Sequence, residues 1–314
     1  MTQELCRFRP ATTGSMVIWE LTRYCNLACV HCCTDSDPDV PTDRDLPTAA
    51  IIEAISDMTA CGMREFFFSG GEPFTRKDLV EIISAVDPQQ GDVFVNTNGY
   101  HVTQELAAQL AGTALRSVTV SIDGATRDVH AILRGKPSSY DRAVRAVGHF
   151  VHAGIPVRIS HVVAAPNVHQ VEDFVHQMLP LGVTGIVVST MFPAGRAARY
   201  PHLLLNEQQT TDLEIRLSAL RAVCAENGVE LDYSLGDSPV TEEGPRGCPA
   251  GSQVFYVSAD GAVSGCSWLY KLDPDRYGIG NLHDTPFRQL LDDLRAQNQT
   301  FMGYQYCPLP LLTT

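Results

Sequence analysis

The stretch MVIWELTRYCNLACVHC, residues 16–32, joins an apolar run to three closely spaced cysteines. The run itself, rich in β-branched and aromatic side chains, predicts a strand over 16–22. Cys25, Cys29 and Cys32 follow this strand directly. Three thiolates so close together can surround one metal centre, and the two-residue gap between the last two cysteines is typical of metal knuckles. The stretch therefore predicts a metal centre at the carboxyl end of a strand.

Apolar runs and segments of helical period alternate along the chain, which predicts repeated strand–helix units. The expected strands are 16–22, 64–70, 92–98, 116–123, 156–163 and 184–190. The expected helices are 47–61, 76–86, 103–112, 139–153, 168–180 and 206–227. Strands that are apolar on both faces and separated by helices form a buried parallel sheet, since right-handed crossovers place the helices outside. We therefore expect an α/β fold with a partial (β/α)6 barrel of the TIM type, whose chemistry lies at the carboxyl ends of the strands.

The pattern changes toward the C-terminal end of the chain. Residues 233–247 are rich in Gly and Pro and lack periodicity, which predicts a linker. Residues 252–266 predict a β-hairpin with Asp260 and Gly261 at its turn, and residues 286–298 predict one amphipathic helix. So few elements bury little apolar surface. Their fold therefore needs additional stabilisation, such as a bound metal centre. We expect three parts, an N-terminal tail, a barrel and a small C-terminal extension, over residues 1–15, 16–232 and 233–314.

Length and composition are those of a globular chain. It has 314 residues, of which 44% are hydrophobic and 19% charged, and this excludes disordered, collagen-like and coiled-coil classes. The formal net charge of −13 disfavours nucleic acid and anionic lipid as partners and favours cationic ligands. No apolar run approaches the length of a membrane span, and no secretory signal opens the chain. We therefore expect a cytoplasmic protein, whose ten cysteines serve metal binding or catalysis more often than disulfides.

A second motif, GGEP, spans residues 70–73 at the end of the second expected strand. Together with the CxxxCxxC spacing of the first motif, it resembles the radical S-adenosylmethionine (SAM) superfamily. The resemblance continues in order through NTNG at 96–99, SIDG at 121–124 and RGKPSSYD at 134–141. A doubly wound sheet fits the same alternation of strands and helices. Because the two main motifs fall at the carboxyl ends of consecutive strands, the barrel is favoured.

The resemblance implies a radical-generating site. Cys25, Cys29 and Cys32 would ligate a [4Fe-4S] cluster, and the amino and carboxylate groups of SAM would bind its fourth iron. Reductive cleavage of SAM would yield methionine and a 5′-deoxyadenosyl radical. Glycines permit close backbone approach and a carboxylate complements a cation, so the second motif would receive the amino group of SAM. Its residues are Gly70, Gly71, Glu72 and Pro73.

Five further polar residues are candidates for binding the ribose and the carboxylate of SAM. Strand-end caps or surface positions explain the same residue types equally well. These candidates are Asn98, Ser121, Asp123, Arg134 and Ser160.

The first cysteine motif has a second explanation. A structural zinc ion takes four protein ligands, and Cys33 or His31 would supply the fourth. Under this alternative the chain is a zinc-binding interaction protein rather than an enzyme. If Cys33 is not a ligand, it is a spare buried thiol or a catalytic redox group.

Three more cysteines, Cys248, Cys266 and Cys307, fall in the C-terminal extension. The spacing of the first two around Gly261 resembles the SPASM/Twitch motif, which implies an auxiliary [4Fe-4S] cluster with Cys307 as a third ligand. Pro310 stands where such domains often carry a fourth cysteine, so one iron is open, takes another ligand or recruits a spare thiol. A zinc staple, or Cys248 as a hydrogen-atom donor instead of a ligand, stays an alternative.

Hydrogen-atom abstraction from carbon is the shared step of the superfamily, and three outcomes stay open. Epimerisation needs a thiol donor, dehydrogenation passes an electron to the auxiliary cluster, and peptide maturases form crosslinks. Because only residues 1–15 precede the first expected strand, we expect no leader-binding domain of the kind that many maturases carry. The sequence resembles the short radical enzymes of aminoglycoside biosynthesis, so we expect epimerisation of a small, polycationic aminoglycoside or cyclitol. The resemblance also implies a reductant such as flavodoxin or ferredoxin.

Overall fold

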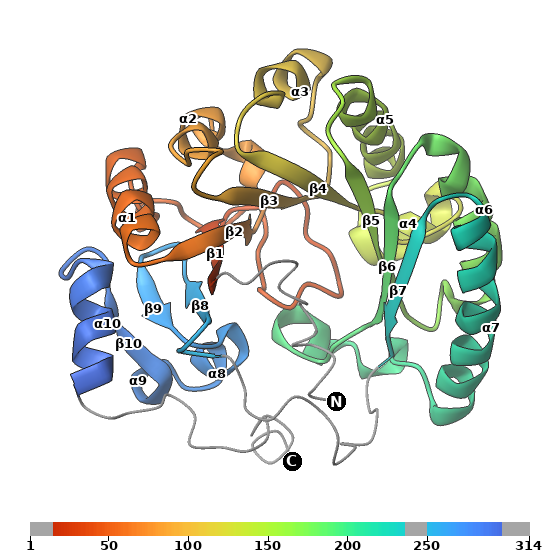
Figure 1. Cartoon of the computed structure of the whole chain (residues 1–314). Coiled ribbons are helices and arrows are strands. Elements are labelled where there is room, and N and C mark those ends of the chain that lie inside the picture. The colour runs from red at the N-terminus through yellow and green to blue at the C-terminus, as the bar shows by residue number, and fades with distance from the viewer. Residues whose placement is uncertain (1–14, 236–249, 297–314) are drawn as a thin grey trace.

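A curved sheet with helices along its convex side organises the chain (Figure 1). The structure, a computed structural model, describes residues 15–235 and 250–296. The strands in this part of the chain are β1 (Ser15–Thr22), β2 (Met63–Gly70), β3 (Asp92–Thr97), β4 (Leu115–Ser121), β5 (Val157–Val163), β6 (Gly185–Thr190), β7 (Glu230–Ser234), β8 (Val254–Val257), β9 (Ala262–Ser264) and β10 (Gly278–Asn281). They form one sheet in the order β10-β9-β8-β1-β2-β3-β4-β5-β6-β7.

The helices that connect the parallel strands cover the outside of the sheet (Figure 1). The helices of the described residues are α1 (Thr48–Ala60), α2 (Leu79–Ser84), α3 (Gln104–Leu110), α4 (Arg127–Arg134), α5 (Ser138–His152), α6 (Val171–Met178), α7 (Glu207–Glu226), α8 (Ser267–Leu272), α9 (Pro274–Tyr277) and α10 (Phe287–Ala296). Of these, α8 and α9 lie between the antiparallel strands β9 and β10. Short 3-10 turns are η1 (Pro73–Thr75), η2 (Val168–Gln170), η3 (Leu179–Leu181), η4 (Gly195–Arg199) and η5 (Pro201–Leu203). Across residues 15–235 and 250–296, no helix has the length and apolar character needed to cross a membrane.

The strand–helix alternation predicted from the sequence is confirmed. Strands β1 to β7 run parallel in chain order, and the expected strands and helices up to α7 are present with bounds shifted by a few residues. Local signals contribute to this agreement, since the Thr103 hydroxyl accepts a hydrogen bond from Leu106 N and begins α3 at the predicted position. The fold is the expected α/β partial barrel.

Alternate strand positions form the core between the sheet and the helices. Trp19 of β1 and Phe66 and Phe68 of β2 are fully buried there, and the ring of Trp19 meets that of Phe68 edge-on at 6.3 Å between centroids. Successive side chains point to opposite faces of a strand, so the intervening residues lie on the concave face. These include Glu20 and Asn96, and the side chain of Asn96 is exposed. Polar groups on the concave face are thus available to a ligand.

Several short elements escaped the sequence patterns: α4, α8, α9, β7 and β10. The five residues of β7 pair with β6, and the last two, Tyr233 and Ser234, belong to the stretch predicted as linker. That prediction is therefore wrong at its start. The strand forms because the edge of β6 offers unpaired backbone groups, which local periodicity does not reveal.

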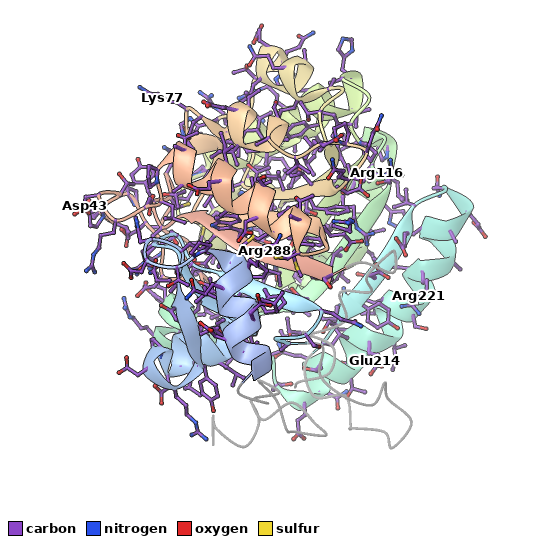
Figure 2. The ribbon with its side chains drawn as sticks, turned by 60° about the vertical axis from the view of Figure 1, so that its left-hand side comes forward. Asp43, Lys77, Arg116, Glu214, Arg221 and Arg288 are labelled. Carbon is purple, nitrogen blue, oxygen red and sulfur yellow. The ribbon has the colours of Figure 1, made fainter. Side chains whose placement is uncertain are left out.

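The C-terminal extension continues the barrel sheet. β8 pairs in parallel with β1, with Met16 opposite Val254. The predicted hairpin is confirmed, since β8 and β9 are antiparallel and Gly261 adopts a φ of 83° at the turn. α10 lies beside α1 (Figures 1 and 2), and beneath it Phe287 meets Phe255 edge-to-face at 5.2 Å. The domain boundaries proposed from the sequence stay a prediction.

Replacing Phe68 with Ala tests the core between β2 and the helices. We expect the free energy of unfolding to fall by about 3–5 kcal/mol, because removal of a fully buried ring leaves a cavity. Ile132→Ala is the control, since this side chain is 49% exposed, and its effect should stay within about 0.5 kcal/mol. Urea-induced unfolding followed by circular dichroism under anaerobic conditions measures both. Equal losses in the two variants would contradict the assigned core.

Candidate functional site

The loop that follows β1 brings the three cysteines of the first motif together. Cys25 and Cys29 are buried with Leu27 in a small apolar cluster, and Cys32 packs against it. Burial raises the pKa of Cys25 to about 12 and that of Cys29 to about 11, and the neighbouring thiols add to both shifts. These thiols therefore release their protons on binding a metal rather than in the free protein.

Two side-chain N–H groups point at these sulfurs. Asn98 Nδ2 lies 3.7 Å from Cys25 Sγ, and Arg134 Nη1 lies 4.0 Å from Cys29 Sγ. Among the residues that the structure describes, no three His, Cys, Asp or Glu side chains converge on the position of a single ion. In an iron–sulfur cubane, by contrast, each cysteine binds a different iron. Hydrogen bonds to the sulfurs adjust the reduction potential of such a cluster. The donor set and its N–H partners fit such a cluster.

The GGEP motif places its backbone against the cysteine loop. Gly71 N donates to Thr22 O at 2.7 Å, and Glu72 N donates to Tyr24 O at 2.9 Å. A Cβ atom on Gly71 would lie 2.0 Å from Tyr24 O, so only glycine permits this approach. Gly70 has the same constraint, with a φ of 125° and Thr22 O at 2.3 Å from its would-be Cβ. The two glycines therefore set the position of the loop that carries the cysteines.

The carboxylate of Glu72 is buried and engaged within the protein. Its Oε1 accepts hydrogen bonds from Thr97 Oγ1 at 2.7 Å and Phe74 N at 3.0 Å, and its Oε2 accepts one from Asn98 N at 2.6 Å. Burial raises the pKa of Glu72 above its ordinary value, and these hydrogen bonds oppose the shift. Glu72 thus caps η1, which begins at Pro73, and ties the end of β2 to the end of β3. Its expected contact with the amino group of SAM stays a prediction.

Asp123, just after β4, is fully buried and joins several parts of the site. Its Oδ2 accepts from Arg134 Nε at 2.5 Å and lies 3.3 Å from His31 Nε2, while its Oδ1 accepts from Val162 N at 2.8 Å. Burial opposes ionisation, but the adjacent Arg134 and His31 hold the pKa of Asp123 well below its usual range. The carboxylate therefore links the cysteine loop, α4 and β5. Its expected contact with ribose stays a prediction.

Three other SAM candidates from the sequence also lie near this site. Ser121 and Ser160 are opposite each other in the pairing of β4 with β5, and both are half-buried on the concave face. The amide of Asn98 is held by Asn26 Oδ1, which accepts from Nδ2 at 2.9 Å, and by Tyr100 N, which donates to Oδ1 at 2.9 Å. Asn98 follows the carboxyl end of β3 and Ser121 ends β4, whereas Ser160 lies in the middle of β5. The contacts of these residues with SAM stay predictions.

His130 is a residue of the site that sequence reasoning missed. Its Nδ1 accepts from Asp123 N at 3.1 Å, and its Nε2 donates to Ser139 Oγ at 2.9 Å. Burial lowers the pKa of His130 to about 4, so the ring is neutral and keeps an acceptor for the backbone of Asp123. Ser139 belongs to the RGKPSSYD motif, and this motif is the feature of the sequence that could have indicated the hydrogen bond between His130 and Ser139.

Arg196 holds the cysteine loop from the opposite side, and no motif marks it. Its Nη1 donates to Cys29 O and Ser36 O, both at 3.1 Å, and its Nη2 pairs with Asp37 at 2.7 Å. The preceding Gly195 lies so close to the loop that a Cβ there would be 2.6 Å from Cys33 O. The Gly-Arg pair of η4 therefore clamps the loop, and only the tertiary approach of η4 reveals this role.

Cys33 lies where the C-terminal extension meets the barrel. Lys271 of α8 pairs with Glu20 of β1 at 2.5 Å. Burial raises the pKa of Cys33 to about 11, although the charge of Lys271 opposes the shift. Cys266 immediately precedes α8, so one predicted auxiliary ligand sits on the element that reaches the concave face. The two other predicted auxiliary ligands lie outside the described residues: Cys248 and Cys307.

A parallel partial barrel with a cysteine loop after its first strand and a glycine pair after its second defines the class of iron–sulfur radical enzymes. Residues 19–178 match the family described as the Radical SAM superfamily. Residues 248–308 match SPASM, an iron-sulfur cluster-binding domain. The chain belongs to the radical SAM superfamily. It binds a [4Fe-4S] cluster, SAM and an auxiliary iron–sulfur cluster.

Relatives of known name include a heme synthase and a mycofactocin maturase. The chain is 27% identical over 297 residues to the AdoMet-dependent heme synthase of Methanosarcina barkeri, covering 88% of this chain and 82% of that one. It is 31% identical over 278 residues to mycofactocin maturase MftC of Mycobacterium ulcerans, covering 87% and 73%. SuiB of Streptococcus suis bound to S-adenosylmethionine shares the fold, with a TM-score of 0.71, 16% identity and coverage of 90% and 68%. These relatives do not support the expected aminoglycoside epimerase.

Replacing Arg196 with Met tests the clamp on the cysteine loop. The variant leaves the carbonyl oxygens of Cys29 and Ser36 without this donor, and we expect a chelator to remove iron about tenfold faster. Arg199→Met is the matched control, because Arg199 is 66% exposed and its ion-pair partner in the described part of the chain is the partly exposed Asp35. The measurement is the anaerobic rate of iron loss from the reconstituted protein. Equal rates in the two variants would refute the clamp.

Replacing Gly71 with Ala tests the close approach of GGEP to the cysteine loop. The added Cβ would meet backbone atoms of Arg23 and Tyr24, so the loop must shift. We expect SAM affinity to fall at least about tenfold, because several ligand contacts depend on this backbone. Gly148→Ala is the control, since beyond its own stretch of α5 no atom of the residues that the structure describes lies within 4 Å of its Cβ position. Equilibrium dialysis with labelled SAM measures both, and unchanged affinity in the Gly71 variant would contradict the interpretation.

Proposed function

We propose that this chain matures a peptide substrate by abstracting a hydrogen atom from one of its carbons. The observation that carries the radical chemistry is the cysteine loop itself. Cys25, Cys29 and Cys32 pack in one small cluster beside a glycine backbone, and N–H donors point at two of the three sulfurs. The 31% identity to mycofactocin maturase MftC over most of both chains supports a peptide substrate.

The protein residues hold and orient the reacting groups. A cluster bound by the three cysteines supplies, together with SAM, the 5′-deoxyadenosyl radical that abstracts the hydrogen atom. Arg134 places a positive charge beside Cys29, and Asp123 fixes the direction of that guanidinium. Cys266, with Cys248 and Cys307, is proposed to hold the auxiliary cluster. The concave face, where Asn96 is exposed, is the surface that faces the substrate.

A second candidate function is epimerisation, or dehydrogenation, of a small alcohol such as an aminoglycoside or cyclitol. Epimerisation needs a thiol that returns a hydrogen atom to the opposite face of the substrate carbon. Cys33 is the candidate for this thiol, because it belongs to the cysteine loop and the charges of Lys271 and Glu20 act on it. The overall charge of −13 favours a polycationic substrate.

Anaerobic reconstitution with SAM and dithionite tests the radical reaction. We expect brown protein with about eight irons, if both clusters are cubanes, and release of 5′-deoxyadenosine. Cys25→Ala should lose about half of this iron and all 5′-deoxyadenosine, because it removes one ligand of the first cluster. Cys224→Ala is the control, since this thiol is buried in the core on α7. Colourless protein containing zinc would instead support the interaction-protein alternative.

Product analysis in deuterium oxide separates the candidate functions. Peptide libraries and candidate aminoglycosides are offered as substrates, with 5′-deoxyadenosine release as the common readout. A modified peptide supports maturation, whereas one solvent deuteron at carbon of a small alcohol supports epimerisation by a thiol. A ketone without solvent deuterium supports dehydrogenation. Release that only small alcohols stimulate would overturn the peptide proposal.

A further inference from the structure

A basic segment stands out in this acidic chain. Residues 127–152, which span α4 and α5, contain five Lys or Arg and only two Asp, whereas the whole chain has a net charge of −13. Arg134 is buried and paired with Asp123, so four of the five basic side chains are at the surface. One of the two aspartates, Asp141, is already paired with Arg127 at 2.8 Å. Lys136 and Arg142 are both exposed. The segment therefore forms a local positive surface on a molecule whose overall field repels anions.

Tyr100 lies at the centre of this positive surface. Lys136 Nζ is 4.4 Å from the centroid of its ring, and Arg142 Cζ is 4.8 Å from it. The ring of His101 is 5.3 Å away, and this side chain is also exposed. A hydrogen bond from Lys136, together with the charge of Arg142, lowers the pKa of the Tyr100 hydroxyl. We call Tyr100, His101, Lys136 and Arg142 the basic face.

The basic face borders the cysteine loop directly. The side chain of Tyr100 packs against the cluster formed by Cys25, Leu27 and Cys29. Tyr100 N donates to Asn98 Oδ1 at 2.9 Å, and Asn98 Nδ2 points at Cys25 Sγ at 3.7 Å. Asn98 therefore connects Tyr100, whose ring is half-buried, to the sulfur of Cys25 through two hydrogen bonds.

The end of α4 fixes this arrangement from the other side. Val30 N, in the cysteine loop, donates to Leu133 O at 2.9 Å, and the left-handed Gly135 then turns the chain toward Lys136. Ser139 donates to Lys136 O at 2.5 Å and accepts from the buried His130. The backbone that carries the positive charge is therefore anchored to the loop that carries the thiols.

We propose that the basic face docks a small acidic one-electron carrier protein. The inference rests on the proposed radical reaction, which consumes one electron at the first cluster for each SAM cleaved. In the docked complex the carrier loses one electron and the cluster gains it, with no bond made or broken. An acidic carrier is repelled by the molecule as a whole, so a local positive surface beside the cluster both attracts it and sets its orientation.

Charge reversal on the basic face provides the test. Fully reconstituted K136E/R142E protein is mixed anaerobically with a reduced acidic flavodoxin at low ionic strength, and reduction of the cluster is followed by stopped-flow absorbance. We expect reduction about tenfold or more slower than in the native protein, and a weaker dependence on salt. The rate of cluster reduction in the neutral variant K136Q/R142Q should lie between those of the native protein and K136E/R142E. In isothermal titration calorimetry with oxidised flavodoxin, the native protein should bind most tightly, the neutral variant less tightly and K136E/R142E most weakly.

Lys77 and Arg116 provide the matched control. Both are exposed, lie outside the basic segment and extend outward in Figure 2. The K77E/R116E variant has the same change in net charge, and we expect reduction by flavodoxin to slow much less. If both double variants slow reduction equally, net charge explains the effect and the docking proposal is wrong.

A chemical reductant separates docking from chemistry. With dithionite, K136E/R142E should reduce its cluster and release 5′-deoxyadenosine at the native rate, because this small reductant needs no docking surface. An equal loss with dithionite and flavodoxin would overturn the proposal, since the substitutions would then have damaged the cluster site. If native protein releases no 5′-deoxyadenosine with dithionite, the proposed function fails instead.

Discussion

The buried carboxylate of Asp123 is the contact on which the arrangement of the site depends. It receives Arg134 from α4, His31 from the cysteine loop and the backbone N–H of Val162 from β5. A fully buried charge is costly unless it is paired and hydrogen-bonded, so the three partners must stay in place together. Because Arg134 also points at Cys29, the position of the proposed cluster is tied to the ends of two strands of the barrel.

Close backbone contacts complete the enclosure of the cysteine loop. Gly71 approaches it from β2, and Gly195 with Arg196 approaches it from η4. None of these contacts leaves room for a larger residue at the glycine, and none involves the reacting atoms. The loop is therefore held by the surrounding barrel rather than by its own secondary structure. Such support is what a metal site needs, because the protein must present its ligands in one geometry.

The two cluster regions belong to one continuous sheet. β8 pairs with β1, and α8 carries Lys271 to Glu20 on the concave side of β1. The extension that the sequence shows as separate in composition is thus built onto the edge of the barrel. Cys266 immediately precedes α8, and the charge of Lys271 on this helix acts on Cys33 of the cysteine loop, although the two cysteines are far apart in the chain.

The sequence by itself determined the parallel barrel, the cysteine loop and the GGEP backbone, because periodicity and short spacing are local properties of the chain. It also placed Ser121 near the carboxyl end of the fourth strand. Only the tertiary structure decided the roles of His130 and Arg196, whose partners lie far away in the chain. It likewise showed that the carboxylates of Glu72 and Asp123 are engaged by protein donors. A short strand such as β7 forms only beside the edge of a neighbouring strand, and ion pairs form only between loops that the barrel brings together. Local sequence patterns therefore predict neither.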